Sequence, residues 1–237
     1  MKFDILKANI VNVYADAIVL PANEMLKEGS STSHAIFEAA GADNLKKACD
    51  KIGHCDIGSA VPTSAFNLDA RYIIHAVVPR WIDGEHNEYS YLSSAYLTSL
   101  KLADVMQCDS IVFPLLASGN NGFDKSLAFQ IATESISSFE SENLKEVHLV
   151  IYGDNTEIFV RSLGYDIKVV EDKTKPFKEA SNDFGNIVMH GLKAAGDWLG
   201  NKDNQRKLVE FGFAIASIVF AGKGKALDVI DALKKLK

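Results

Sequence analysis

The chain has 237 residues, of which 47% are hydrophobic and 24% are charged, which is the balance of a globular protein. Its net charge of −6 is uneven, because residues 1–170 hold 13 Lys and Arg against 22 Asp and Glu (net −9) whereas residues 171–237 hold 12 against 9 (net +3). An acidic body argues against general nucleic-acid binding, which needs a basic surface to neutralise phosphates.

Short apolar runs alternate with helical patterns as far as residue 170. "DAIVLPAN" is typical of a buried strand that ends at Pro21, and "SHAIFEAAG" of a helix with Ser33 as a candidate N-cap and Gly41 as its stop. "ADNLKKACDKIG" predicts a second helix, closed by Gly53. Further strands are expected at 59–66, 70–79 and 110–116, helices at 89–107 and 125–139, and further elements at 146–153, 155–164 and 166–170. This alternation predicts a mostly parallel sheet with helices on both faces.

The last part of the chain has a different pattern. Residues 171–186 are polar and are expected to form a linker, and residues 187–237 read as two or three helices, a C-terminal helical extension. Residues 211–222 are apolar throughout, but 12 residues are too few to span a bilayer, so we expect no membrane span and a buried helix instead. These helices are candidates for self-assembly or for binding another protein.

The loop "LASGNNGFD", residues 116–124, joins a predicted strand to a predicted helix. Glycines there permit close backbone approach, and free N–H groups at a helix N-terminus suit a phosphate. The P-loop pattern G-x-x-x-x-G-K-[ST] and the dinucleotide pattern G-x-G-x-x-G are both missing from the sequence. A second loop in "PANEMLKEGSSTSHAI" also follows a buried strand and opens a helix. Two such loops could clamp one diphosphate between them.

Several segments in register then resemble one family. "DAIVLPAN", "AIFEAAG", "GSAVPTSAFNL", "RYIIHAVVP", "IVFPLLASGNNGF" and "VHLVIYG" resemble the macro domain, an ADP-ribose-binding module, over about residues 1–170. The resemblance implies a three-layer α/β/α sandwich with a mixed, mostly parallel sheet. It also implies that the partner is ADP-ribose or an ADP-ribosylated macromolecule, with nucleic acid expected only as such a target.

The resemblance assigns the diphosphate to the two loops. The family's "GGGGVDGAI" in the first loop corresponds to residues 28–36, "EGSSTSHAI", where Gly29 is the one glycine that remains and Ser30, Ser31 and Thr32 add hydroxyls. In the second loop the position of the family's aromatic residue is Asn121, and Phe123 supplies an aromatic ring two residues later. The implied diphosphate-binding residues are Gly29, Ser30, Ser31, Thr32, Ser118, Gly119, Asn120, Asn121, Gly122 and Phe123.

The resemblance also assigns the two ends of the ligand. Asn23 holds the place of the asparagine that bonds the distal ribose, and its amide can both donate and accept. Asn9 holds the place of the family's aspartate at the adenine amino group, with Ile10 beside it, so the acceptor there is uncharged. Tyr152 matches a position that stacks on adenine. Read alone, Asn9 and Asn23 are also typical turn residues.

Catalysis is a weaker expectation than binding. Ser33 stands where the family has a hydrolytic aspartate, and a serine hydroxyl is no general base at neutral pH. His34 follows and could serve as a base, although its side chain points about 100° away around the helix. If the chain is an enzyme, Asn23 would position a water at the distal ribose.

We expect neither a metal nor a cofactor. Cys49, His54 and Cys55 lie close in sequence, but their spacing is not a standard zinc pattern. Three cysteines cannot all pair, and the N-terminus lacks an apolar leader, which together favour a cytoplasmic location. Three hypotheses stay open: a module that binds ADP-ribose, an ADP-ribosyl hydrolase or O-acetyl-ADP-ribose deacetylase, and an interaction protein whose role is set by its helical tail.

Overall fold

The structure is a computed structural model, and it describes residues 1–170. The predicted linker at 171–186 and the predicted helical extension at 187–237 lie outside these residues. Within residues 1–170, no helix is both long enough and apolar enough to cross a membrane.

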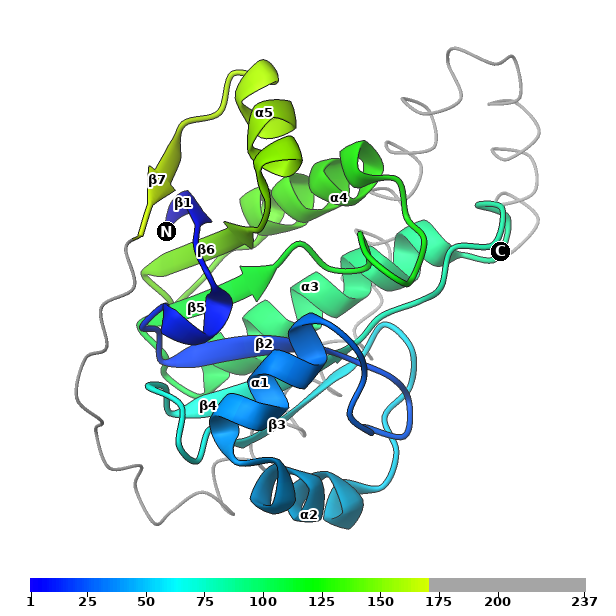
Figure 1. Cartoon of the computed structure of the whole chain (residues 1–237), viewed down its shortest axis with the longest axis vertical. Coiled ribbons are helices and arrows are strands. Elements are labelled where there is room, and N and C mark those ends of the chain that lie inside the picture. The colour runs from blue at the N-terminus through cyan, green and yellow to red at the C-terminus, as the bar shows by residue number, and fades with distance from the viewer. Residues whose placement is uncertain (171–237) are drawn as a thin grey trace.

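A seven-stranded sheet forms the middle layer (Figure 1). Its spatial order is β3-β4-β2-β5-β6-β1-β7, and all neighbours are parallel except the edge strand β3, which runs antiparallel to β4. The predicted mixed, mostly parallel sheet is therefore confirmed. The strands are β1 (Lys2–Lys7), β2 (Ala17–Ala22), β3 (Ala60–Ser64), β4 (Tyr72–Val77), β5 (Ser110–Pro114), β6 (Glu146–Ile151) and β7 (Ile167–Val169).

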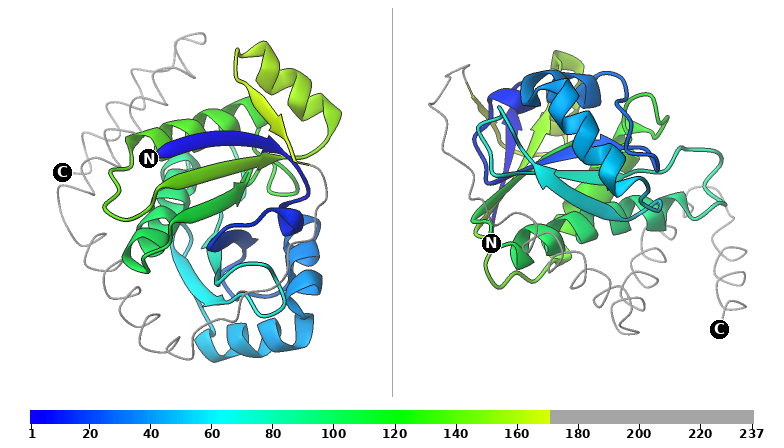
Figure 2. Two further views of the ribbon diagram at one scale, coloured as in Figure 1. Left: turned by 90° about the vertical axis from the view of Figure 1, so that its left-hand side faces the viewer. Right: turned by 90° about the horizontal axis from the view of Figure 1, so that it is seen from below.

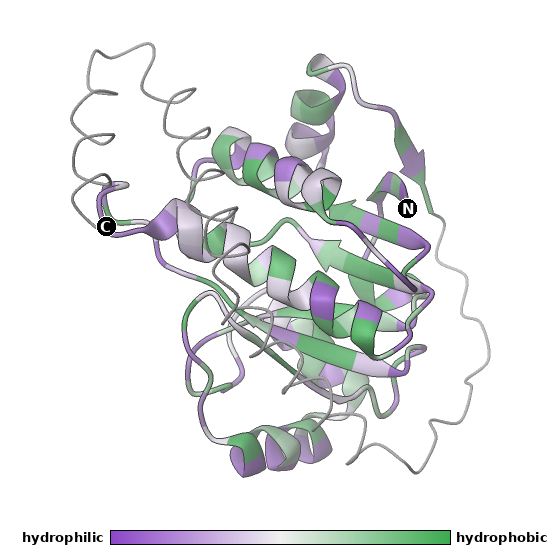
Figure 3. Cartoon of the chain, turned by 180° about the vertical axis from the view of Figure 1, so that it is seen from behind, coloured by the Kyte–Doolittle hydropathy of each residue, from purple (hydrophilic) through white to green (hydrophobic). Residues whose placement is uncertain are grey.

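Helices cover both faces, which confirms the predicted three-layer sandwich. One face carries α1 and α2, and the other carries α3 and α4, as the right-hand view of Figure 2 shows. Each face has its own apolar core, and the strands between the two cores are largely hydrophobic (Figure 3). The helices are α1 (Thr32–Ala40), α2 (Ala42–Ile52), α3 (Glu88–Val105), α4 (Lys125–Ser138), α5 (Asp154–Ser162) and a short 3-10 helix η1 (Ile10–Asn12).

The glycine stops are confirmed and one predicted cap is wrong. Gly41 ends α1 with a φ of 92°, in the left-handed region that glycine reaches without a Cβ penalty, and Gly53 ends α2. Ser33 is not the N-cap of α1, because the helix already begins at Thr32 and Ser33 is buried in its first turn. Its hydroxyl instead accepts a hydrogen bond from the Gly29 N–H at 3.0 Å, which fixes the loop before the helix.

Strand β1 was not foreseen from the sequence. Its residues mix charged and apolar side chains, yet it lies between β6 and β7, with Ile5 opposite both Leu149 and Ile167. Because β1 is parallel to its neighbours, its carboxyl end lies on the same side of the sheet as the carboxyl ends of β2, β5 and β6. The candidate site lies at these carboxyl ends.

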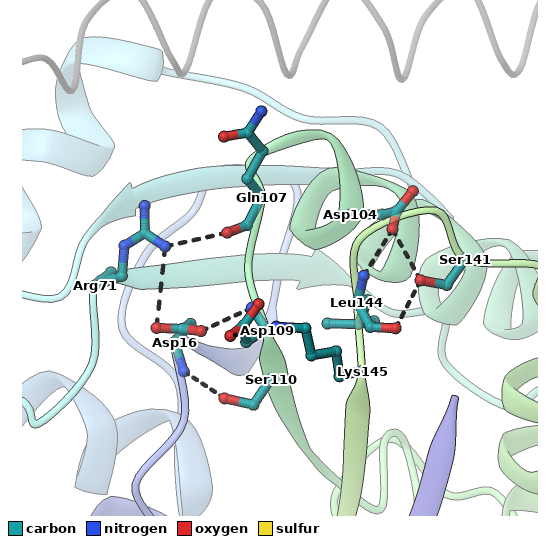
Figure 4. A network of polar contacts seen from close by, with 9 residues as sticks. All are labelled: Asp16, Arg71, Asp104, Gln107, Asp109, Ser110, Ser141, Leu144 and Lys145. Atoms are coloured by element: carbon teal, nitrogen blue, oxygen red, sulfur yellow. Dashed lines mark hydrogen bonds and ion pairs between the residues drawn. The ribbon is translucent and has the colours of Figure 1, made fainter.

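At the amino ends of the strands, the buried carboxylate of Asp104 and the half-buried carboxylate of Asp16 hold the loops (Figure 4). Asp104, at the end of α3, accepts hydrogen bonds at one oxygen from the Ser141 hydroxyl and from the backbone N–H groups of residues 142–144. Asp16 accepts from the Asp109 N–H at 2.8 Å, and Arg71 lies 4.0 Å from its other oxygen. These contacts tie the loops before β5 and β6 to the body, so they position the strands without belonging to the site.

Candidate functional site

The carboxyl ends of β1, β2, β5 and β6 open into two adjoining cavities. Their volumes are about 610 Å³ and about 490 Å³, and both lie where ligands bind in parallel α/β folds. The two cavities share lining residues from both predicted loops, so they form one continuous cleft. The shared residues are Ser31, Thr32, Pro114, Leu115 and Ser118.

The two loops meet across the middle of this cleft. The Asn120 side-chain amide donates a hydrogen bond to the Ser30 hydroxyl at 2.6 Å, joining residues that are 90 positions apart. Inside the second loop, Gly122 donates its N–H to the Gly119 carbonyl at 2.9 Å, and the Ser118 hydroxyl bonds the Leu115 carbonyl. The loops therefore have a defined shape without a ligand.

Both loops expose unused backbone donors. The seven N–H groups named below have no protein acceptor within residues 1–170. Such runs of N–H groups in a turn form concave sites for anions. They belong to Ser30, Ser31, Thr32, Ser118, Gly119, Asn120 and Asn121.

The helix after the second loop offers no such site. The Asp124 carboxylate caps α4 and accepts from the N–H groups of Ser126 and Leu127, so the first donors of that helix are already satisfied. The helix whose N-terminus could bind an anion is therefore α1. Its N-cap residue is Ser31, and the Ser31 side chain makes no capping hydrogen bond. The second loop contributes through its own backbone.

The second cavity contains the residues expected at adenine. Asn9, Ile10 and Tyr152 all line it, and the Tyr152 ring is 82% exposed. The Asn9 side-chain oxygen accepts a long hydrogen bond, 3.4 Å, from the Val11 N–H at the start of η1. A carbonyl oxygen has two lone pairs, so Asn9 retains one acceptor position and its amide donors.

Asn23 lines the first cavity and is held from behind. Its amide donates to the Lys27 carbonyl at 2.7 Å, and its oxygen accepts from the Lys27 N–H at 3.1 Å. This pair of bonds fixes the side chain at the end of β2 while leaving one donor and one acceptor position free. The sequence allowed Asn23 to be a ligand residue or a turn residue; its bonds to Lys27 show the turn role, and its ligand role stays a prediction.

Asn121, at the family's aromatic position, and Phe123, the nearby aromatic residue, occupy different environments. Asn121 lines the first cavity, and its amide is bonded to the Pro79 carbonyl at 2.9 Å. Phe123 is 4% exposed, packs edge-to-face on Trp81 with ring centroids 5.2 Å apart, and does not line either cavity. Gly122 also lies outside the lining, where its φ of 82° turns the chain. The structure does not bring the Phe123 ring to the cleft.

His34 points away from the cleft, as its place on the helix indicated. It is exposed, lies outside the lining of both cavities, and its Nδ1 is 2.5 Å from a carboxylate oxygen of Glu28. The hydrogen bond to Glu28 raises the pKa of His34, which increases its protonated fraction. A protonated imidazole cannot accept a proton, so His34 is poorly suited to act as a base.

The buried polar residues of the core have ordinary structural roles. Burial lowers the pKa of His75 to about 3, and its ring is 2.9 Å from the Thr63 hydroxyl and 3.9 Å from the Cys49 sulfur. Burial also raises the pKa of Cys49 to about 11 and that of Cys55 to about 12, so neither thiol ionises near neutral pH.

Sequence reasoning missed one wall of the first cavity. The segment that follows β4 and runs into the first turn of α3, "PRWIDGEHNEYS", supplies several of its lining residues and is hydrogen-bonded to Asn121 of the second loop. Its mixture of aromatic, charged and glycine residues between two regular elements was the signal available in the sequence. The polar and large apolar lining residues missed include Glu24, Ile57, Arg80, Ile82, His86, Glu88 and Tyr91.

Comparisons with known proteins agree with this geometry. The sequence model of the macro domain matches residues 19–132. A macro domain-containing protein of Caldanaerobacter subterraneus is 43% identical over 157 residues, covering 65% of this chain and 90% of that protein. An O-acetyl-ADP-ribose deacetylase of Escherichia fergusonii is 39% identical over 169 residues, covering 68% of this chain and 95% of that enzyme.

Solved structures give the same match. A mutant of the Oceanobacillus iheyensis macrodomain solved with ADPR superposes with a TM-score of 0.62 and 28% identity, covering 68% of this chain and 90% of that one. The same macrodomain solved with ADP gives a TM-score of 0.62 and 30% identity, covering 68% and 88%.

Proposed function

The chain belongs to the macro domain family, and from that premise we propose that it binds ADP-ribose, free or attached to a macromolecule, along the cleft. The observation that carries this proposal is the set of unused N–H groups on both loops around the shared middle of the cleft. A diphosphate is the anion that would accept from both loops at once.

The places of adenine and of the distal ribose then follow from the residues on either side of the diphosphate. Adenine occupies the second cavity, where Tyr152 offers a ring face and Asn9 offers an amide. The distal ribose occupies the first cavity beside Asn23, whose free donor and acceptor positions suit vicinal hydroxyls. Asn9 is uncharged, so selectivity for adenine rests more on stacking than on a charged hydrogen bond.

Calorimetric titration of the full chain with ADP-ribose tests the proposal, with AMP and ATP as controls. We expect 1:1 binding in the micromolar range, roughly −8 kcal/mol, with a clear preference for ADP-ribose over both controls. AMP fills only the adenine end, and ATP has no distal ribose to reach Asn23. Absence of heat with folded protein, or equal affinity for all three nucleotides, would refute the proposed site.

A second candidate is hydrolysis of ADP-ribosyl or O-acetyl-ADP-ribose esters. The observation that favours it is the 39% identity to a relative named as an O-acetyl-ADP-ribose deacetylase. In this chain Ser33 is buried against Gly29 and His34 is paired with Glu28, so neither suits the task of a base. Glu24, which follows Asn23 and lines the same cavity, is the carboxylate we propose for that task.

Release of ADP-ribose from a mono-ADP-ribosylated protein tests this second candidate. Wild type, Asn23→Ala and Glu24→Gln should be compared at equal ligand saturation. Loss of release in both variants, with ADP-ribose still bound by Glu24→Gln, would support hydrolysis at this site. Release that survives Asn23→Ala would place the chemistry elsewhere.

We propose a cytoplasmic location, supported by three unpaired cysteines, and a chain divided into a macro domain at 1–170, a linker at 171–186 and a helical extension at 187–237. Light scattering on the full chain and on a chain ending at residue 170 tests whether the extension assembles the protein. An unchanged mass after truncation would argue against assembly through it.

A further inference from the structure

The first cavity continues past the place assigned to the distal ribose. Beyond Asn23 it is lined by Ile57 and by four residues of the segment before and at the start of α3. We call this part the acceptor chamber, and it consists of Ile57, Arg80, Ile82, His86 and Tyr91. ADP-ribose ends at its distal ribose, so the chamber is open to whatever group that ribose carries.

We propose that the acceptor chamber binds the polypeptide to which ADP-ribose is attached, and that Arg80 selects targets with an acidic side chain beside the modified residue. The inference rests on the proposed binding of ADP-ribose and names its substrate class.

The apolar side chains of the chamber fit a polypeptide better than a small acyl group. Ile82 is 63% exposed and Tyr91 is 39% exposed, and both line the cavity, with Ile57 half-buried beside them. Large apolar side chains that remain open at the mouth of a binding cleft mark contact surfaces. An acetyl group is too small to cover both Ile82 and Tyr91, whereas a peptide running out of the cleft would cover them.

The chamber wall is rigid before any target arrives. Glu88 is 1% exposed, and one of its carboxylate oxygens accepts from the N–H groups of Ile82, Asp83 and Gly84 at 3.1 to 3.2 Å. Its other oxygen accepts from the His86 N–H at 2.7 Å. Because four backbone donors hold this loop, little conformational entropy is lost when a peptide packs on it.

The wall is also joined to the loop assigned to the diphosphate. Trp81 donates its backbone N–H to the Asn121 carbonyl at 2.7 Å. Its ring packs edge-to-face on Tyr89, with centroids 5.4 Å apart, and on Phe123. The buried Phe123 thereby fixes the chamber relative to the bound ligand, rather than covering the ribose itself.

The charges in the chamber point to an acidic neighbour of the modified residue. Arg80 is exposed and has no hydrogen bond or ion pair within residues 1–170. His86 is already paired, because its Nδ1 lies 2.9 Å from Asp83, and the Glu88 carboxylate is satisfied by backbone N–H groups. Glu24, beside Asn23, would repel an anion at the ribose end of the chamber, so a target carboxylate belongs at Arg80. A nucleic-acid target is disfavoured by the net charge of −9 on residues 1–170.

The test uses peptides that carry ADP-ribose on one side chain through a non-hydrolysable linkage. Two neighbouring residues are Glu, Gln or Lys, and free ADP-ribose is titrated in parallel into the full chain. We expect the Glu-flanked peptide to bind roughly two- to fivefold more tightly than the Gln-flanked peptide, the range of a partly exposed ion pair, and this advantage to fade at high salt. Arg80→Gln should abolish the advantage and leave the Kd of free ADP-ribose unchanged. Lys51→Gln, which removes the same charge from the exposed end of α2, should keep it.

The outcomes separate this inference from the proposed function. If free ADP-ribose does not bind, the proposed function fails first. If ADP-ribose binds but wild type shows no difference between the flanking residues, the selection by Arg80 is wrong. If Arg80→Gln weakens free ADP-ribose and peptides by one common factor, Arg80 belongs to the ribose site and the acceptor chamber is refuted. If an Ile82→Ser variant binds every peptide as tightly as wild type does, the proposed apolar contact between Ile82 and the peptide is wrong.

Discussion

Gly119 allows the diphosphate assignment to be tested without disturbing the fold. A Cβ built at Gly119 meets no atom within 4 Å, and the residue lies outside the positive-φ region that disfavours other side chains. A new side chain at this position therefore projects into open space beside the unused N–H groups. Substitution should leave the free energy of unfolding within about 0.5 kcal/mol of wild type, as for other exposed positions.

The charge of the new side chain sets the magnitude of the effect. In Gly119→Glu a carboxylate about 5 Å from a phosphate charge repels it by about 3 kcal/mol at an effective dielectric constant of 20. That penalty corresponds to a roughly hundredfold weaker ADP-ribose affinity. Gly119→Gln has the same size without the charge, so it should lose much less affinity.

Calorimetry and thermal unfolding of wild type, Gly119→Gln and Gly119→Glu in one buffer check these expectations. The Glu variant should also recover part of its affinity at high salt, because screening weakens the repulsion. If Glu and Gln weaken binding equally, the diphosphate does not lie beside Gly119. If Glu binds as wild type does, the second loop is not a phosphate loop. A large drop in the unfolding midpoint would mean that the space around Gly119 has been misread.

Three further predictions concern the adenine end, the contact between the loops, and the loops at the amino ends of the strands. Tyr152→Ala should weaken ADP-ribose binding about two- to tenfold by loss of one aromatic contact, and leave the unfolding midpoint unchanged because the ring is 82% exposed. Unchanged affinity in calorimetry would exclude Tyr152 from the site. Asn120→Ala removes the hydrogen bond to Ser30, so association and dissociation of ADP-ribose should both become faster in stopped-flow measurements. Rate constants equal to those of wild type would show that this bond does not restrain the loops. Asp104→Ala leaves three backbone N–H groups, one of them buried, without their acceptor and should lower the free energy of unfolding in urea by about 3 kcal/mol at neutral pH. Burial opposes ionisation of Asp104, but the donors around it outweigh burial and lower its pKa, so the difference should shrink as pH falls below about 4, where this stabilisation is lost. A difference that does not depend on pH would contradict this account.

The regular elements with strong local patterns could be predicted from the sequence. Continuous apolar runs gave β2 and β5, because an interior strand is buried on both faces and needs no polar residue. The stops at Gly41 and Gly53 follow from the left-handed backbone that glycine tolerates. β1 could not be predicted in this way, because its run of apolar residues is interrupted by charged ones, such as Asp4, which pairs with Lys168 on the neighbouring strand β7.

The parts of the site whose position follows from the ends of strands could be predicted, whereas the parts whose position depends on side-chain packing could not. The loop positions follow from the ends of β2 and β5, and residues 30–32 and 118–121 do meet in one cleft. Whether Phe123 turns toward the cleft depends on Trp81, which is 42 positions away and leaves no signal in the local pattern. The acceptor chamber was missed for the same reason, because hydrogen bonds from backbone N–H groups to the buried Glu88 carboxylate set the shape of its wall, and the local sequence pattern does not show them.

The departures from the family's glycine-rich first loop form a coupled set rather than separate losses. Ser33 replaces an aspartate, yet its hydroxyl holds the Gly29 N–H, and Ser30 replaces a glycine, yet its hydroxyl accepts from Asn120 on the other loop. A loop of four glycines would lose more conformational entropy on ordering around a diphosphate. Two side-chain hydrogen bonds fix this loop in advance, while Ser31 and Thr32 still present free N–H groups. The same substitutions that weaken the case for a general base therefore favour retention of the ligand, which is why binding, rather than hydrolysis, is the function that these residues support best.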